Sequence, residues 1–268
     1  MLSERTRQAY ELIRETFFRK PFIWVAHVAG FAIYALFWLL FLPSDQEAGL
    51  FLFYWGGFFL PLALSAGILG DDIASGRIAV LATRPIALRD IYLYRLLGLS
   101  LQGTVHLLGA GAGICLLDMA LGKGTPNSLG LWLWATWLLF MACAALSTTV
   151  SVVVGRSYNA LLVLFLVVFS HFVLDVLGGY WLEGSLAGAI SALLRHIGPP
   201  FELLQRVAHG DYGKFSLSVG KYGVIKTVAC SVHCVLLTAV YATVGIQILT
   251  RSLSENSVVG PRESNFFV

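Results

Sequence analysis

Six apolar runs, each long enough to cross a bilayer, constrain this chain more than any other feature. Charged residues lie only near the ends of these runs. An apolar helix rises 1.5 Å per residue, so about 20 residues cross a hydrocarbon core of about 30 Å. The sequence therefore predicts an all-α integral membrane protein with six transmembrane helices. The runs cover residues 22–42, 50–69, 91–117, 129–154, 158–178 and 223–249.

The composition agrees with this class. The chain has 268 residues, of which 57% are hydrophobic and only 12% are charged. Soluble domains carry about 25% charged residues. The net charge of +3 is spread over the loops, so it indicates membrane topology and predicts no nucleic-acid partner. All four cysteines fall in apolar runs, where buried thiols usually act as small hydrophobic side chains.

Residues 1–20 are rich in charge and show one helical face. The side chains on that face recur every three or four residues, as in an amphipathic helix. We expect this helix to lie on the cytoplasmic surface of the bilayer, although an ordinary helical tail has the same pattern. The residues of the face are Leu2, Thr6, Ala9, Ile13 and Phe17.

Residues 179–221, between the fifth and sixth runs, differ from the rest of the chain. They contain charges and two short apolar stretches, residues 186–197 and 201–208, separated by Gly198-Pro199-Pro200. Both stretches are too short to cross a bilayer, so they predict re-entrant or interfacial helices in an extracytoplasmic loop. Residues 251–268 are predicted to be a polar cytoplasmic tail.

The distribution of basic residues predicts the orientation. Six spans place both termini on one side of the membrane. Twelve of the 18 Lys and Arg residues fall on that side, which also holds the segment between the second and third spans. The positive-inside rule therefore places the termini and that segment in the cytoplasm, in a multi-pass protein of the inner or plasma membrane.

Residues 71–95 form a polar elbow between the second and third runs. A segment with so many charges cannot cross the bilayer, so it must lie at the surface. Because a residue before proline avoids helical geometry, the elbow should contain a short helix that ends near Thr83 and a second that starts after Pro85. Tyr92, Tyr94 and Arg95 are expected to form an interface belt, with the arginine reaching headgroups. The charged residues are Asp71, Asp72, Arg77, Arg84, Arg89, Asp90 and Arg95.

The elbow resembles the loop between spans two and three of ABC-type exporter permeases, the type-2 group with the type V fold. Such permeases show an acidic residue, a glycine four later, a hydrophobic pair, a proline, an acidic–apolar pair and a basic residue. Asp72 stands where glutamate is usual, Arg77 where threonine is common, and Arg95 where lysine is common. The matching positions are Asp72, Gly76, Val80-Leu81, Pro85, Asp90-Ile91 and Arg95.

The resemblance implies a permease dimer, of identical or related chains, with two cytoplasmic ATPase subunits docked on the elbow. It implies export of a substrate such as a lipid, glycan or drug. It also implies that ATP and Mg²⁺ bind the partner ATPase and that this chain binds no cofactor. Ile78, Leu81 and Ala82 lie three or four apart, which predicts an apolar ridge suited to a groove on the ATPase. The docking residues are predicted to be Asp72, Gly76, Arg77, Ile78, Leu81, Arg84, Pro85 and Arg89.

The residues themselves indicate that energy comes from another chain. Ion-driven carriers usually need an ionisable group inside the membrane, and these runs have none between their ends. The sequence also lacks the G-x-x-x-x-G-K-[ST] phosphate loop. The chain is therefore expected not to be an enzyme in its own right. Two alternatives stay open, a membrane enzyme that acts on lipid and a scaffold or sensor without transport activity.

A few polar side chains in the runs are candidates for function. His171 and Asp175 lie four apart on the fifth run and predict either a gate in the substrate path or a water-exposed helix end. Both also lie close to Glu183, near the outer surface where a lipid enzyme would need acids. The other candidates are a soft-metal set that is more simply explained as incidental, Cys230, His233 and Cys234, and an interhelical hydrogen-bonding pair, Gln102 and His106.

Overall fold

The computed structural model describes residues 4–41, 46–84, 86–120, 122, 129–155, 158–169, 193, 197–209 and 223–258. The described residues form helices and turns, with no strand among them. The helices are α1 (Glu4–Phe18), α2 (Phe22–Phe41), α3 (Gln46–Ser65), α4 (Gly70–Ala74), α5 (Arg77–Ala82), α6 (Leu88–Ala120), α7 (Leu129–Val153), α8 (Tyr158–Val168), α11 (Phe201–His209) and α12 (Gly223–Val258).

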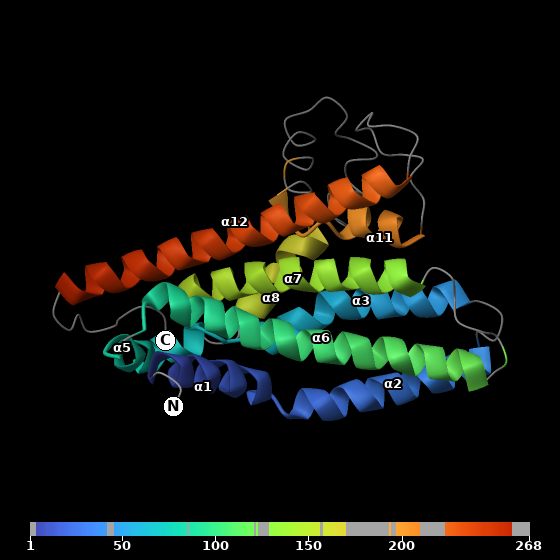
Figure 1. The fold of residues 1–268 in the computed structure, drawn as a ribbon, viewed down its shortest axis with the longest axis horizontal. Helices are drawn as coiled ribbons and strands as arrows, with labels where there is room; N and C mark the ends of the chain where they lie inside the picture. The colour runs from blue at the N-terminus through green and yellow to red at the C-terminus, as the bar shows by residue number, and fades with distance from the viewer. Residues whose placement is uncertain are drawn as a thin grey trace.

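The long helices form a bundle around α7 (Figure 1). Helix α7 packs against α3, α6, α8, α11 and α12. Its buried side chains include many small ones, which let neighbouring helices approach closely. Those small buried residues are Ala135, Thr136, Ala142, Cys143, Ala144, Ala145, Ser147, Thr148, Thr149 and Ser151.

Among the described residues, four helical stretches are long and apolar enough to cross a membrane: Phe53–Ala74, Leu88–Ala120, Leu129–Val153 and Thr227–Ser252. Large apolar side chains lie exposed along α6 and α12, as expected of surfaces that face lipid. The chain is therefore a helical multi-pass membrane protein. Helix α8 is apolar but shorter, and residues 170–178 of the fifth predicted run lie outside the described part of the chain.

Two glycines shape the elbow between α3 and α6. Gly67 and Gly76 both have φ +71°, in the left-handed region that the backbone of residues other than glycine rarely adopts. Gly67 follows α3, and Gly76 separates α4 from α5. Helix α5 ends at Ala82 and α6 begins at Leu88, so the predicted helix break near Thr83 is confirmed.

Helix α11 covers the second of the two short apolar stretches predicted after the fifth run. It has nine residues, too few to span, and it follows Gly198-Pro199-Pro200. It packs on α7, and the Tyr54 hydroxyl donates to the Phe201 carbonyl over 2.5 Å. Most of residues 186–197 lie outside the described residues, so the predicted partner helix and the extracytoplasmic position of this loop stay predictions.

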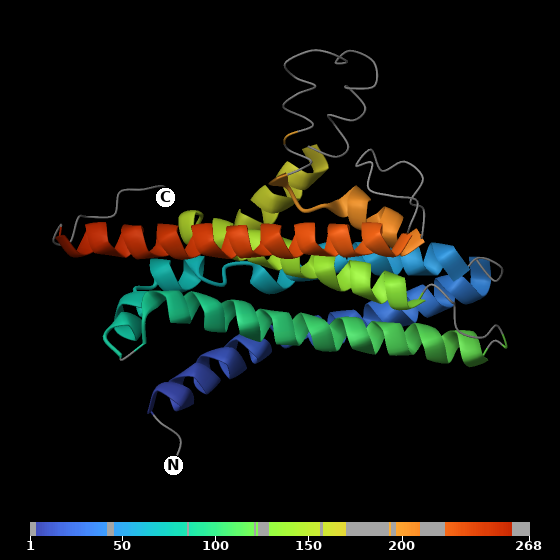
Figure 2. The same cartoon turned by 45° about the horizontal axis from the view of Figure 1, so that its top comes forward.

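Helix α12 continues beyond the sixth predicted run to Val258, so residues 251–258 of the predicted polar tail are helical. The cytoplasmic position of this tail stays a prediction. The C-terminal end of α12, the N-terminal end of α1 and α5 lie at the same end of the bundle (Figures 1 and 2).

Candidate functional site at the polar elbow

Helix α1 packs along the start of α6 and presents three different faces. Gln8, Leu12 and Thr16, spaced by four, are buried against the rest of the chain. The apolar face predicted from the sequence is only partly buried at Ala9 and Ile13, so it lies beside the buried face of the helix. The third face is charged and exposed, with Glu4, Arg7, Glu11 and Arg14. An amphipathic helix is thus present at Glu4–Phe18, and its buried face includes the polar residues Gln8 and Thr16.

The approach of α1 to α6 depends on a glycine. A Cβ built on Gly98 would lie 2.6 Å from the Ile13 carbonyl oxygen and 2.8 Å from Thr16 Cβ. The first of these is a backbone atom, so a side chain at this position can be accommodated only if α1 moves.

Gly98→Val is expected to push α1 off α6 and to destabilise the fold by about 1–3 kcal/mol, the usual range for overpacking. The matched control is Gly109→Val on the same helix, where a Cβ would meet nothing within 4 Å. Thermal unfolding in detergent measures both variants. Equal midpoints for the two would show that α1 does not depend on this close contact.

Arg95 is the centre of the elbow. Its side chain is fully buried, its Nη2 donates to Asp72 Oδ2 over 2.7 Å, and its Nη1 donates to Thr16 Oγ1 over 2.9 Å. The prediction that Arg95 reaches headgroups is wrong. A guanidinium enters a protein interior only when it is paired, and α1 and α4 supply the acceptors here. Tyr92 is also buried rather than interfacial, with its hydroxyl 2.9 Å from Thr149 Oγ1.

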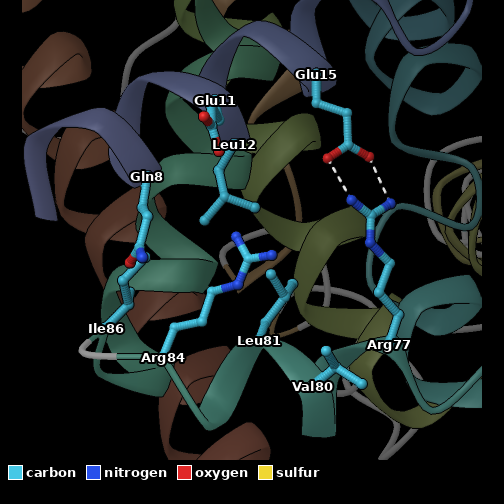
Figure 3. A pocket seen from close by; sticks show the side chains of 9 residues that line it. All are labelled: Gln8, Glu11, Leu12, Glu15, Arg77, Val80, Leu81, Arg84 and Ile86. Atoms are coloured by element: carbon cyan, nitrogen blue, oxygen red, sulfur yellow. Dashed lines mark hydrogen bonds and ion pairs between the residues drawn. The ribbon is translucent and has the colours of Figure 1, made fainter. Parts of the chain in front are cut away.

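Glu15 and Arg77 extend this network towards solvent. Two hydrogen bonds of 2.6 and 2.5 Å run from the Arg77 guanidinium to the Glu15 carboxylate (Figure 3). Glu15 also lies 3.4 Å from Arg95, and Arg77 lies 3.8 Å from Asp72. Burial disfavours the charged form of Glu15, but the hydrogen bond from Arg77 and the charge of Arg95 outweigh it and lower the pKa of Glu15. The hydrogen bond to Glu15 raises the pKa of Arg77.

We call Glu15, Thr16, Asp72, Arg77 and Arg95 the elbow clamp. These residues come from α1, α4, α5 and α6 and join all four helices. Bidentate and charge-assisted hydrogen bonds fix geometry better than single neutral ones. The elbow clamp therefore holds the elbow against α1 as one unit.

Further ion pairs and hydrogen bonds tie α1 to the elbow outside the elbow clamp. Arg19 donates to Asp71 Oδ2 over 2.8 Å and to the Gly67 and Ile68 carbonyls. At the other end of α1, Arg5 pairs with Asp90 over 2.5 Å. That pair is largely exposed on the arginine side, so we expect it to contribute little to stability.

Asn159, at the start of α8, holds the turn between α3 and α4 from the opposite side. Its Oδ1 accepts from the Gly67 amide, and its Nδ2 donates to the Ser65 carbonyl and to Ser147 Oγ, each over 3.0 Å. Asn159 is fully buried. Its role could not be found from the sequence, because an asparagine in an apolar run has no distinguishing spacing.

The predicted apolar ridge on α5 is not exposed. Ile78 is 1% exposed and belongs to the main hydrophobic core, and Leu81 is 5% exposed and packs with Leu12, Ile86 and Ile91. The ridge prediction is therefore wrong: the spacing marks one face of a helix, and that face covers the chain's own core. The exposed side chains of α5 and of the two residues after it are Arg77, Ala79, Val80, Ala82, Thr83 and Arg84.

The other predicted docking residues fall into three groups. Asp72 is buried in the elbow clamp, and Gly76 forms the left-handed turn between α4 and α5. Arg77 is exposed at the edge of the elbow clamp. The Arg89 side chain is 70% exposed and lies 3.5 Å from Asp90. Pro85 lies outside the described residues. Docking of a partner on this segment stays a prediction.

The remaining polar candidates do not form a site in the described part of the chain. His171, Asp175 and Glu183 lie outside it. Cys230 and Cys234 are buried, and no group of three or more His, Cys, Asp or Glu residues gathers among the described residues.

The hydrogen-bonding prediction for Gln102 and His106 is not met. Neither His106 nitrogen nor Gln102 Nε2 has a hydrogen-bond partner among the described residues. The His106 ring instead packs on two rings of α2, at 4.1 Å from Trp24 and 4.7 Å from His27 between centroids. His106 therefore contributes aromatic packing between α2 and α6, and its two nitrogens form no polar bridge within the described residues.

No protein-family model matches this chain, and no curated protein matches it at a significant level. The elbow clamp and the surface beside it are therefore the basis for a functional proposal. Two positions of the permease-like pattern, Asp72 and Arg95, form the buried ion pair, and a third, Gly76, has positive φ.

Proposed function

We propose that this chain is the transmembrane permease subunit of an ATP-driven exporter. It has six spans, with both termini and the elbow in the cytoplasm. It works with a second permease chain and with two ATPase subunits, which hold ATP and Mg²⁺. The transported substrate is a lipid, glycan, drug or similar molecule, and a specific one is not assigned.

The elbow clamp is the observation that supports this proposal most strongly. It joins α1 to two short helices and to the start of a long, membrane-crossing helix, α6. A flexible loop would absorb a push from a partner. A segment held by a fully buried Arg95–Asp72 ion pair behaves as a rigid body, so displacement of α5 moves α1 and α6 with it.

The lack of charged side chains in the middle of the described apolar stretches supports a separate ATPase. The four membrane-crossing stretches carry Asp, Glu, Lys and Arg only near their ends. The whole sequence contains no phosphate loop. Both facts agree with a chain that receives motion from ATP hydrolysis elsewhere.

The docking surface follows from the corrected orientation of α5. Ala79, Ala82, Thr83 and Arg89 are exposed, while Ile78 and Leu81 are buried. Small exposed side chains allow close approach of a partner backbone, and a peripheral arginine steers docking more than it strengthens it.

Ala82→Asp is expected to lower the amount of copurifying ATPase subunit at least tenfold and to leave the fold unchanged, because Ala82 is exposed. The control is Ala120→Asp. Ala82 and Ala120 are both exposed and are the last residues of α5 and α6, so the intrinsic effect of aspartate on each helix end is matched.

Pull-down from the native membrane, with quantitative mass spectrometry of the bound proteins, measures the effect. Normal ATPase recovery and normal transport with Ala82→Asp would remove α5 as the docking surface. A membrane enzyme or a scaffold would instead purify without any ATPase, whichever variant is used.

A further inference from the structure

A pocket of about 210 Å³ lies between α1 and α5, beside the elbow clamp (Figure 3). Its apolar floor is formed by Leu12, Leu81 and Ile86, which pack together in a small core of their own. Val80, 61% exposed, lines its outer wall. Pockets for drug-sized ligands measure about 300–1,000 Å³, so this one suits a single large side chain.

Two polar groups of the pocket have unmet bonding capacity. Gln8 is only 6% exposed, and its Oε1 has no hydrogen-bond partner in the described part of the chain, while its Nε2 donates to Glu4 over 3.0 Å. A buried acceptor of this kind is unfavourable until it is paired. The Arg84 guanidinium points towards Leu12 in Figure 3 and forms no ion pair or hydrogen bond within the described residues.

Each of the two carboxylates of the pocket has an arginine near it. Glu15 is held by Arg77 through two hydrogen bonds, and Glu11 lies 3.8 Å from Arg7. Above its apolar floor, the pocket therefore offers one hydrogen-bond acceptor, the Gln8 amide oxygen, and one cation, the Arg84 guanidinium. A peptide segment meets all three needs, because its backbone N–H reaches the amide oxygen, a carboxylate pairs with the arginine and a large apolar side chain covers the floor.

We propose that residues 263–267 of this same chain occupy the pocket. In this arrangement the Glu263 carboxylate pairs with Arg84, a ring of the Phe266-Phe267 pair covers Leu12 and Leu81, and a backbone N–H of the segment donates to Gln8. The segment Glu-Ser-Asn-Phe-Phe supplies an acid and two aromatic rings within five residues. Aromatic side chains bury the largest apolar area per residue, so they suit a small apolar floor.

The C-terminal end of α12 and the pocket lie at the same end of the bundle (Figure 1). Helix α12 packs on α6 near the start of that helix, where Gly245 meets Tyr92, and α6 packs on α1. Extended chain covers at most about 3.3–3.6 Å per residue, so the stretch from residue 259 to 265 reaches about 25 Å.

Tethering favours this occupant over a separate peptide. A short flexible connection gives a local concentration in the millimolar range, so weak contacts suffice for occupancy. Any partner that needs the same surface must first displace the segment. The proposal is independent of the transport function.

Disulfide cross-linking in the full-length chain, purified in detergent, tests the proposal. Cysteine is placed at Val80, on the pocket wall, and at Asn265, and the disulfide-linked peptides are quantified by mass spectrometry after mild oxidation. The control pairs Asn265→Cys with Tyr10→Cys, because Tyr10 is 62% exposed on α1 but does not line the pocket. We expect at least fivefold more disulfide for the Val80 pair than for the Tyr10 pair.

Two further changes separate specific binding from random collision. Adding Phe266→Ser with Phe267→Ser, or Arg84→Gln, should lower the Val80–Asn265 yield to that of the control. Equal yields for the two cysteine pairs, or a yield that neither change lowers, would overturn the proposal. Mixing isotopically heavy and light chains provides a last check, since disulfides that join heavy to light peptides would assign the segment to a second copy and refute occupancy within one chain.

Discussion

Arg95→Met is expected to destabilise the folded chain by about 3–5 kcal/mol, the usual effect of removing one partner of a buried ion pair. Methionine fills much of the space of the arginine stem but carries no charge. Asp72, 4% exposed, would keep a buried carboxylate without its 2.7 Å partner. Thr16 Oγ1 would lose its donor as well.

Thermal unfolding in detergent measures the effect of Arg95→Met. Arg14→Met, on the exposed face of α1, is the control and should leave the unfolding midpoint unchanged. The double variant Asp72→Asn with Arg95→Met should recover part of the loss, because it removes the unpaired charge. If Arg95→Met matches Arg14→Met in stability, the buried pair does not hold the elbow.

Ile78→Asp is expected to destabilise the chain by more than about 4 kcal/mol, a range that marks burial of an unpaired charge or loss of core packing. Ile78 is 1% exposed and lies in the main core, so the change removes apolar burial and inserts a carboxylate there. The neighbouring variant Ala79→Asp adds the same charge on the exposed side of α5.

Size-exclusion chromatography and the unfolding midpoint distinguish these two variants. Ile78→Asp should aggregate or unfold early, while Ala79→Asp should elute as the unmodified chain does. A well-folded Ile78→Asp that only loses its partner would mean that Ile78 faces outward, as the spacing of Ile78, Leu81 and Ala82 first indicated.

The helical membrane class and the position of the elbow could be predicted because strong physical constraints act on them. The thickness of a bilayer sets the length of an apolar run, and charges cannot remain in its centre. The helix break before α6 could also be predicted, because Arg84-Pro85 restricts the backbone locally. These features depend on neighbouring residues alone.

Side-chain orientation at the elbow could not be predicted, because it depends on residues far apart in the sequence. An arginine at the start of an apolar run suits headgroups as well as a buried acid, and only the fold brings Thr16 and Asp72 to Arg95. The i, i+3 spacing of Ile78 and Leu81 likewise fits a partner's groove or the chain's own core. The hydrogen bonds of Asn159 link α8 to residues more than 90 positions away at Ser65 and Gly67.

The most direct test of the central claim is purification of the unmodified chain from its native membrane under mild conditions, followed by quantitative identification of its partners and an ATP hydrolysis assay. The account predicts an ATPase subunit in a one-to-one ratio with this chain, with hydrolysis lost from the Ala82→Asp preparation and kept in the Ala120→Asp preparation. Recovery of the folded chain with no ATPase and no ATP hydrolysis would contradict its assignment as a permease subunit.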